Sequence, residues 1–221
     1  MTDLSRGFKR LSADEASKAL YIDFEGEKDK APVLLGTLRR PGGGPTPFVY
    51  QEVLDPTFEG FGLAVLSLRA AVGKVVVRAE ARDCRIVSWS EHDLEVVRTL
   101  RPDDPDLVAR FEARYANALA VAKRWRNSVH GGQMPASGRL GDYLDLIEYT
   151  VPGDAAPGHV GDTIRRLRSR LERGLSLTEA HHDRWQELIE HNRHDCAGMR
   201  RVAVKATELV APARDPKGAH D

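Results

Sequence analysis

Ala19-Leu20-Tyr21-Ile22-Asp23-Phe24-Glu25-Gly26 is the stretch that decides the fold. Strand-forming residues fill it, and Gly26 can end the strand. Because side chains alternate between the two faces of a strand, Asp23 and Glu25 point to the same side. Two carboxylates held close together on a mostly apolar strand repel each other and lose solvation. A hard divalent cation with oxygen ligands relieves both costs, so the sequence predicts a metal site at this strand.

Three more strands are predicted from the residues that follow. The first two cover 32–38 and 47–54, with a loop rich in glycine and proline between them. Short connections between consecutive strands predict an antiparallel meander. A fourth strand, short and apolar, is expected at 85–89. A helix is predicted over 60–81, although Val75-Val76-Val77 is also compatible with a strand.

The second half of the chain is predicted to be mostly helical. Helices are expected from Ser90 to Leu100, over 106–125, for a turn or two at 143–147, from 161 onward, and from about 178 to 210. The segment 127–138 is expected to be a loop, which is either a lid or a boundary. This order predicts an α/β fold with a mixed sheet flanked by helices. We expect a lead-in at 1–18, irregular or a short helix, a single domain at 19–210 and a flexible tail at 211–221.

Charge excludes one class of binding protein. The 221 residues include 33 basic and 33 acidic side chains, so the net charge is zero. This balance argues against a protein that binds nucleic acid mainly through an overall positive field. Five arginines nevertheless lie within 165–173, where they are either a solvated helix face or a contact surface for phosphates. Apolar runs are only a few residues long, and the first residues lack an apolar signal segment. The sequence therefore predicts a cytoplasmic protein with no membrane partner.

A second acidic position follows the strand at 85–89. Ser90-Glu91-His92-Asp93 leads from the strand end into a helix start. If that strand is parallel to the first, its carboxyl end brings Asp93 near Asp23 and Glu25, with Glu91 as the fallback ligand. The same four residues fit a capping box, in which Asp93 only satisfies an amide at the helix end.

A third acidic position lies on the last helix. Asp195 falls on the apolar stripe of this helix, where a carboxylate needs a partner or a cation. His191 lies four residues earlier on the same side and is a candidate proton acceptor. An ordinary hydrogen bond between the two side chains along the helix is the alternative.

These residues together resemble a known family. Asp23-Phe24-Glu25, an acidic residue after the fourth strand, and His191-Asn192-Arg193-His194-Asp195-Cys196 resemble the ordered motifs of the DEDD 3′-5′ exonucleases of the ribonuclease H-like fold. The nearest likeness is a predicted branch associated with RecB-type nucleases or helicases, whose last motif commonly reads Tyr-Asn-x-x-Asp-Cys. The resemblance covers about residues 19 to 205.

The resemblance implies a fold, an activity and a site. The fold would be ribonuclease H-like, and the activity would be exonucleolytic hydrolysis of single-stranded DNA or RNA. Two Mg²⁺ or Mn²⁺ ions, favoured over zinc by oxygen-only ligands, would be held by four carboxylates, those of Asp23, Glu25, Asp93 and Asp195. His191 would orient or deprotonate the attacking water. A helicase or a RecB-type nuclease would be a partner, and nucleic acid would contact Arg165, Arg166, Arg168, Arg170 and Asn192.

The sequence also departs from the family pattern and leaves rival functions open. Histidine replaces the tyrosine of the last motif, so the general base is either His191 or His194, and the middle motif lacks the usual asparagine and aromatic neighbours. One rival is an HD-type metal phosphohydrolase, suggested by pairs such as His182-Asp183, whose fold is all helical. The other rival is a binding module on a ribonuclease H-like scaffold that has lost its chemistry.

Overall fold

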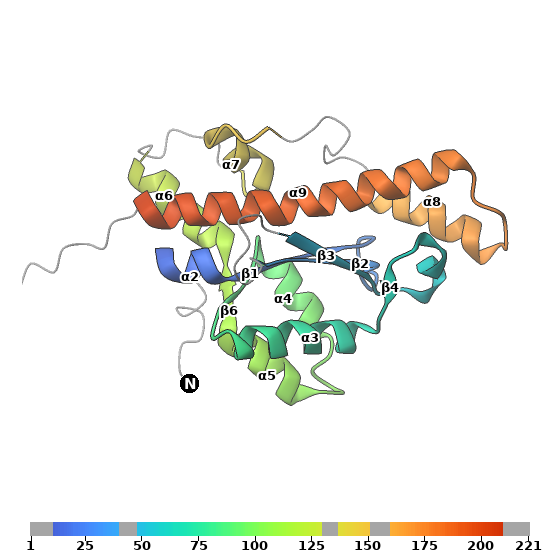
Figure 1. The fold of residues 1–221 in the computed structure, drawn as a ribbon, viewed down its shortest axis with the longest axis horizontal. Helices are drawn as coiled ribbons and strands as arrows, with labels where there is room; N and C mark the ends of the chain where they lie inside the picture. Colours follow the sequence, from blue (N-terminus) through green and yellow to red (C-terminus); the bar gives the residue numbers. More distant parts are fainter. Residues whose placement is uncertain (1–10, 40–47, 130–136, 151–159, 210–221) are drawn as a thin grey trace, which may run out of the picture.

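The computed structural model describes residues 11–39, 48–129, 137–150 and 160–209. A mixed sheet of six strands forms its centre, in the order β4-β3-β2-β1-β5-β6 (Figure 1). The strands are β1 (Leu20–Glu25), β2 (Leu34–Arg39), β3 (Phe48–Val53), β4 (Ala64–Val65), β5 (Ile86–Ser88) and β6 (Tyr115–Asn117). The helices are α2 (Ala13–Lys18), the 3-10 helix η1 (Pro56–Phe61), α3 (Leu68–Ala81), α4 (Glu91–Arg98), α5 (Pro105–Arg114), α6 (Ala118–Val129), α7 (Leu140–Leu146), α8 (Val160–Glu172) and α9 (Glu179–Leu209).

The strand pairing confirms the predicted meander. β1 pairs with β2 and β2 with β3, both antiparallel. β5 lies parallel to β1 on the other side, and β6 is parallel to β5. The prediction of a mixed α/β sheet is therefore confirmed, and the carboxyl ends of β1 and β5 lie at the same edge of the sheet.

Helices cover both faces of the sheet (Figure 1). α9 crosses one face, with α2, α6 and α7 beside it, whereas α3, α4 and α5 cover the other. Alternation along β1 fits these layers, because Leu20, Ile22 and Phe24 pack on the side of α3 to α5 and Tyr21 packs on the side of α9. Asp23 and Glu25 therefore face α9.

The helix predicted over 106–125 is wrong, because the structure divides this segment into α5, β6 and α6. The three residues of β6 form a parallel ladder with β5, and all three are buried. Pairing within the sheet overrides the local helical pattern here. Asn117 gives the one local signal, since its Oδ1 accepts a hydrogen bond from the Ala120 N–H at 3.0 Å, as a residue at a helix start does.

The helix predicted over 60–81 is correct only in its second part. Residues 56–65 form η1 and the short strand β4, and α3 begins after Ser67, whose Oγ accepts from the Ala70 N–H at 3.2 Å. Val75-Val76-Val77 is helical, so the alternative of a strand there is excluded. Val75 and Val76 are buried against the sheet and Val77 is exposed, which is the spacing of a helix with one buried face.

The predicted lead-in contains α2. A capping box of Ser12 and Glu15 starts this helix, and Leu11 and Ala16 pack into the core beneath α9. Residues 1–10, residues 130–136 of the predicted loop and the tail at 211–221 lie outside the described residues, and α6 extends into the predicted loop as far as Val129. The division into lead-in, single domain and tail stays a prediction.

No helix in the described ranges is long and apolar enough to cross a lipid bilayer.

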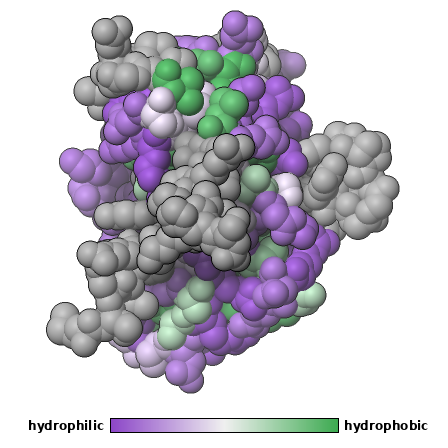
Figure 2. All heavy atoms as spheres, turned by 90° about the vertical axis from the view of Figure 1, so that its left-hand side faces the viewer, coloured by the Kyte–Doolittle hydropathy of each residue, from purple (hydrophilic) through white to green (hydrophobic). Residues whose placement is uncertain are grey.

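On the end of the molecule shown in Figure 2 the described surface is mostly hydrophilic, with a small group of hydrophobic side chains near the top of the view. This surface agrees with the high content of charged residues, 30% of the chain.

Arg168 joins α8 to the end of the sheet. Its guanidinium pairs with Glu27, which follows β1, and with Asp55 at 3.0 Å, which precedes η1. It also lies over the Phe58 ring, 6.0 Å from the ring centre. Because the Arg168 side chain is only 12% exposed, these contacts form part of the interior packing between α8 and η1.

We predict that Arg168→Ala lowers the free energy of unfolding by about 2 kcal/mol, because it removes the arginine from Asp55 and leaves the poorly solvated Glu27 carboxylate with its contact to Lys30. Arg165→Ala is the matched control, since Arg165 lies on the same helix with a side chain that is 61% exposed. We expect that control to change stability by less than about 0.5 kcal/mol. Urea denaturation of both variants measures the difference, and equal losses would contradict the interior role of Arg168.

Candidate metal centre

A cleft of about 1210 Å³ lies beside the ends of β1 and β5, under α9. Its walls come from β1, the start of α4, α7 with the residues after it, the first residue of α8, and α9. The acidic residues that line it are Asp23, Glu25, Asp93, Asp142, Asp145, Glu148 and Asp195. Its basic lining residues are His92, Arg139 and His191, and its aromatic lining residues are Phe24, Trp89 and Tyr149.

Asp23 is held in place from α9. The Asn192 Nδ2 group donates to Asp23 Oδ2 at 2.9 Å and to the Asp23 carbonyl oxygen at 3.1 Å. Gln51 on β3 donates to Asn192 Oδ1 at 3.0 Å and so fixes the orientation of that amide. Asn192 is fully buried and rests on Gly36 of β2, where a Cβ would lie only 2.8 Å from Asn192 Cγ. A glycine inside β2 therefore lets α9 approach the sheet closely enough to hold Asp23.

Asp93 reaches the same strand from the start of α4. Its Oδ1 accepts a hydrogen bond from the Phe24 N–H at 3.1 Å. This N–H is available because the ladder between β1 and β5 ends at the pair Tyr21 and Val87. Ser90 supplies the N-cap of α4 through its own hydroxyl, so the Asp93 carboxylate is directed to β1. Asp93 is 4% exposed, whereas the fallback ligand Glu91 is exposed.

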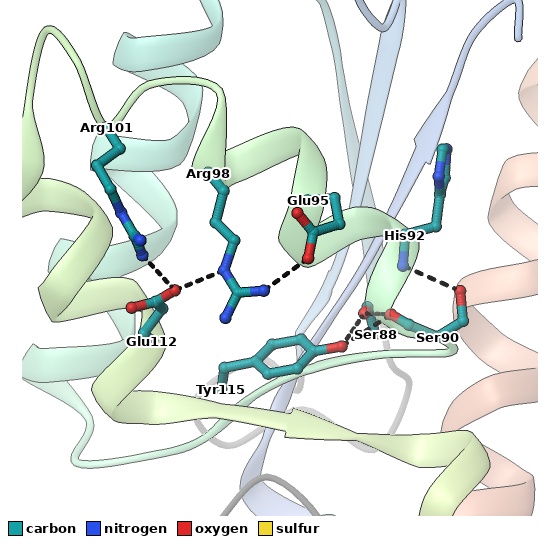
Figure 3. A network of polar contacts seen from close by, with 8 residues as sticks. All are labelled: Ser88, Ser90, His92, Glu95, Arg98, Arg101, Glu112 and Tyr115. Carbon is teal, nitrogen blue, oxygen red and sulfur yellow. Dashed lines mark hydrogen bonds and ion pairs between the residues drawn. The ribbon is translucent and has the colours of Figure 1, made fainter. Parts of the chain in front are cut away.

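A network of polar contacts fixes this start of α4 (Figure 3). The Tyr115 hydroxyl of β6 donates to the Ser90 carbonyl oxygen at 2.8 Å and lies 3.0 Å from Ser88 Oγ. Along α4, Arg98 Nε donates to Glu112 of α5 at 2.7 Å. The strand that sequence patterns missed, β6, thus helps to set where α4 enters the cleft.

Among the described residues, Glu25, His191 and Asp195 form a group that could hold a metal ion. His191 Nε2 lies 3.8 Å from Glu25 Oε1 and 3.6 Å from Asp195 Oδ2, and one donor atom of each residue lies within 4.8 Å of the others. His191 is 7% exposed and Glu25 is 8% exposed. The i, i+4 spacing of His191 and Asp195 on α9 places both side chains over the end of β1.

Each of the four carboxyl groups has a raised pKa. Burial raises the pKa of Asp23 well above its ordinary value, and the charges of Glu25, Asp195 and Asp93 raise it further. Burial likewise raises the pKa of Glu25 to about 7 and that of Asp93 to about 6, and it raises the pKa of Asp195. The mutual effect of these charges places the four groups in one electrostatic cluster.

This cluster fits a divalent cation. Glu25 Oε1 is buried and, among the described residues, has no hydrogen-bond partner. A buried carboxylate oxygen without a donor is costly, and a cation would supply the missing interaction. The carboxylate oxygens suit Mg²⁺ or Mn²⁺, and an imidazole nitrogen beside them suits a first-row transition ion such as Mn²⁺.

Some of the predicted site residues come together in the cleft, whereas others make different contacts. Asp23, Glu25, Asp93, His191 and Asp195 all line the cleft. His194, the alternative general base, instead bonds through Nδ1 to the Tyr149 hydroxyl at 2.8 Å. Asn192 has a role other than the predicted contact with nucleic acid, because it is fully buried and positions Asp23.

The predicted arginines do not form one surface at the cleft. α8 begins with Val160 at the cleft wall, and Arg170 lies ten residues further along, about 15 Å away. Arg168 is engaged by Glu27 and Asp55, so we do not retain it as a nucleic-acid ligand. Arg166 lines a separate pocket between α8 and the start of α9. Contact of Arg165, Arg166 and Arg170 with nucleic acid stays a prediction.

Sequence patterns missed an acidic wall opposite β1. Asp142, Asp145 and Glu148, from α7 and the turn after it, line the same cleft as the four predicted carboxylates. The spacing of three residues between Asp142 and Asp145 was the available signal, because it puts these two on one side of a helix. Glu148 lies after the end of α7, so the spacing does not place it. The packing of Leu144 on Gly198 of α9 holds α7 at the cleft, and a Cβ at Gly198 would come within 2.7 Å of this leucine.

Comparisons of the chain with protein-family models, with curated proteins and with solved structures find no match.

We predict that, without metal, Glu25→Gln raises the free energy of unfolding at pH 8 by on the order of 2 kcal/mol. The folded-state pKa of Glu25 is about 7 against an ordinary value of 4.5. Its contribution to stability is therefore fully present below pH 4.5 and is lost as the pH rises through 7. Glutamine imitates the neutral form, so the gain should shrink as the pH falls from 8 toward 4.5.

Denaturation in EDTA at several pH values measures this gain. Glu59→Gln is the control, since Glu59 is exposed on η1, and it should leave the pH dependence unchanged. A loss of stability in Glu25→Gln at pH 8 would contradict an electrostatic cost at this position.

We also predict that Gly36→Ala is strongly destabilising, by about 2 kcal/mol or more, because the new Cβ collides with the Asn192 amide. Asn192→Ala removes the colliding group, so the double variant should lose less stability than the sum of the two single variants. Unfolding measurements on all three variants test this coupling. Simple additivity would show that Gly36 and Asn192 do not depend on each other.

Proposed function

We propose that this protein is a divalent-metal-dependent nuclease of the DEDD type, which hydrolyses phosphodiester bonds of single-stranded DNA or RNA from the 3′ end. One observation carries the proposal. Asp23 and Glu25 on β1, Asp93 at the start of α4 and Asp195 on α9 come from three distant segments and line one cleft, and their charges act on one another. Their order along the chain is the one that the resemblance to DEDD exonucleases implies.

The sheet adds support for the finer fold assignment. An antiparallel meander of β1 to β3 is followed by strands parallel to β1 on its other side, with helices on both faces. This is the arrangement expected for the ribonuclease H-like fold from the sequence. The all-helical HD-type phosphohydrolase is the weaker rival, because the six strands are incompatible with it.

The residues of the cleft would have different roles in such a reaction. Asp23, Glu25, Asp93 and Asp195 would hold the cations, and the hydrogen bonds from Asn192 and from the Phe24 N–H keep two of these carboxylates oriented. Divalent ions bound there would activate a water and stabilise the leaving 3′ oxygen of the phosphodiester. Glu25 and Asp93 are buried, whereas Asp23 and Asp195 are half-buried, and all four are accessible from the cleft.

Charge in the cleft requires the cations to bind before the substrate does. Seven carboxylates line it, against two histidines and one arginine, so a polyanion is repelled by the metal-free protein. His92 and Arg139 are the basic groups of the lining outside the carboxylate cluster, and they are positioned to meet a phosphate. A helicase or RecB-type partner and a cytoplasmic location remain predictions.

Degradation of labelled oligonucleotides tests the function. We expect the protein with Mn²⁺ or Mg²⁺ to shorten 5′-labelled single-stranded DNA or RNA stepwise, and 3′-labelled strands to release mononucleotide at once. Asp23→Ala should reduce the rate by at least about 100-fold, because removing one group of a metal cluster disrupts the whole unit.

Asp183→Ala is the matched control, because Asp183 is an exposed carboxylate on α9, twelve residues and about 18 Å before Asp195. Equal activity of wild type and Asp23→Ala would exclude this site. If the wild type binds cations but cleaves no strand, the binding module without chemistry becomes the better description.

A further inference from the structure

The position of His191 suits a metal ligand as well as a general base. Its Nε2 lies 3.8 Å from Glu25 Oε1 and 3.6 Å from Asp195 Oδ2. Bonds of about 2.1 Å put two ligand atoms of one ion about 3 to 4.2 Å apart. Both distances fall within this range, so one ion can contact all three side chains after a shift of a few tenths of an ångström between the carboxylates, whose atoms lie within 4.8 Å.

A second observation marks the space between these side chains as a cation position. Glu25 is 8% exposed, and its Oε1, the oxygen nearest to His191, has no hydrogen-bond partner within the described part of the chain. The oxygen thus faces the imidazole at a distance too long for a hydrogen bond. A cation between Oε1 and Nε2 would supply the interaction that Glu25 Oε1 lacks among the described residues.

His191 is also fixed well enough to act as a ligand. Its side chain is 9% exposed, and the neighbouring Asn192 is bonded to β1 and β3, so this part of α9 cannot move without breaking those contacts. His194 differs, because its Nδ1 is bonded to Tyr149. Only one of the two histidines therefore points to Glu25 and Asp195.

The type of ligand affects which metal is preferred. Mg²⁺ favours oxygen ligands, whereas first-row transition ions accept an imidazole nitrogen together with carboxylates. We propose that His191 directly ligates the cation held by Glu25 and Asp195, and that this position selects a transition ion such as Mn²⁺ over Mg²⁺. This inference rests on the proposed function only in requiring a cation at the cluster.

Calorimetric titration with Mn²⁺ and Mg²⁺, one metal at a time, tests the inference. The wild type should bind Mn²⁺ at least tenfold more tightly than Mg²⁺. His191→Ala should weaken Mn²⁺ binding at least tenfold and Mg²⁺ binding much less, so that the preference disappears. His194→Ala is the matched control on the same helix and should keep the preference. Circular dichroism of each variant verifies folding.

Pulsed electron paramagnetic resonance gives an independent readout. Bound Mn²⁺ should show coupling to a ligand nitrogen in wild type and in His194→Ala, and this coupling should be lost in His191→Ala. A general base that does not touch the metal predicts another result, in which His191→Ala is slow in turnover but keeps the Mn²⁺ affinity. That result, or a wild type without nitrogen coupling, would overturn the inference.

The outcomes separate the two proposals. A protein that binds Mn²⁺ through His191 but cleaves no oligonucleotide contradicts the nuclease function and leaves the ligand assignment standing. If the wild type cleaves oligonucleotides and His191→Ala keeps the Mn²⁺ affinity of the wild type, the ligand assignment is contradicted and the nuclease function stands. If no divalent ion binds to the wild type, both proposals fail.

Discussion

Repulsion among the carboxylates at the end of β1 is the constraint on which the rest of the structure depends. Asp23 and Glu25 face α9 because the other side of β1 is committed to the core with α3 to α5. Asp93 and Asp195 then approach the same point from two helices, and burial raises the pKa of all four groups. Four carboxyl groups brought together in this way cost stability unless protons or a cation neutralise them.

Several contacts hold the repelling groups together. Asn192 bonds Asp23, Gln51 orients Asn192, and the glycine at position 36 gives the amide its space. On the other side, the short β5 leaves the Phe24 N–H for Asp93. The Tyr115 hydroxyl and the pair of Arg98 with Glu112 hold the helix that carries Asp93. These contacts fix the carboxylates in advance, so a cation would find its ligands already arranged.

Sequence patterns predicted the strand and helix that carry most of the candidate site. They missed features that depend on contacts between residues far apart in the chain. Alternation along β1 and the apolar stripe of α9 placed Asp23, Glu25 and Asp195 correctly, because local periodicity determines which side chains share a face. β6 was missed because its three residues become a strand only by pairing with β5. The role of Asn192 was mistaken for a similar reason, since its partners Gly36 and Gln51 lie more than 140 residues earlier in the chain.

The central claim is that three distant segments form one cation site. Anomalous scattering from a crystal of the protein soaked in Mn²⁺ tests it most directly, because it locates the ion without reference to activity. We predict an anomalous peak between Glu25, His191 and Asp195, with Asp23 and Asp93 on its β1 side. No peak in this cleft at saturating Mn²⁺, or a peak only at surface carboxylates such as Glu59, would contradict the account.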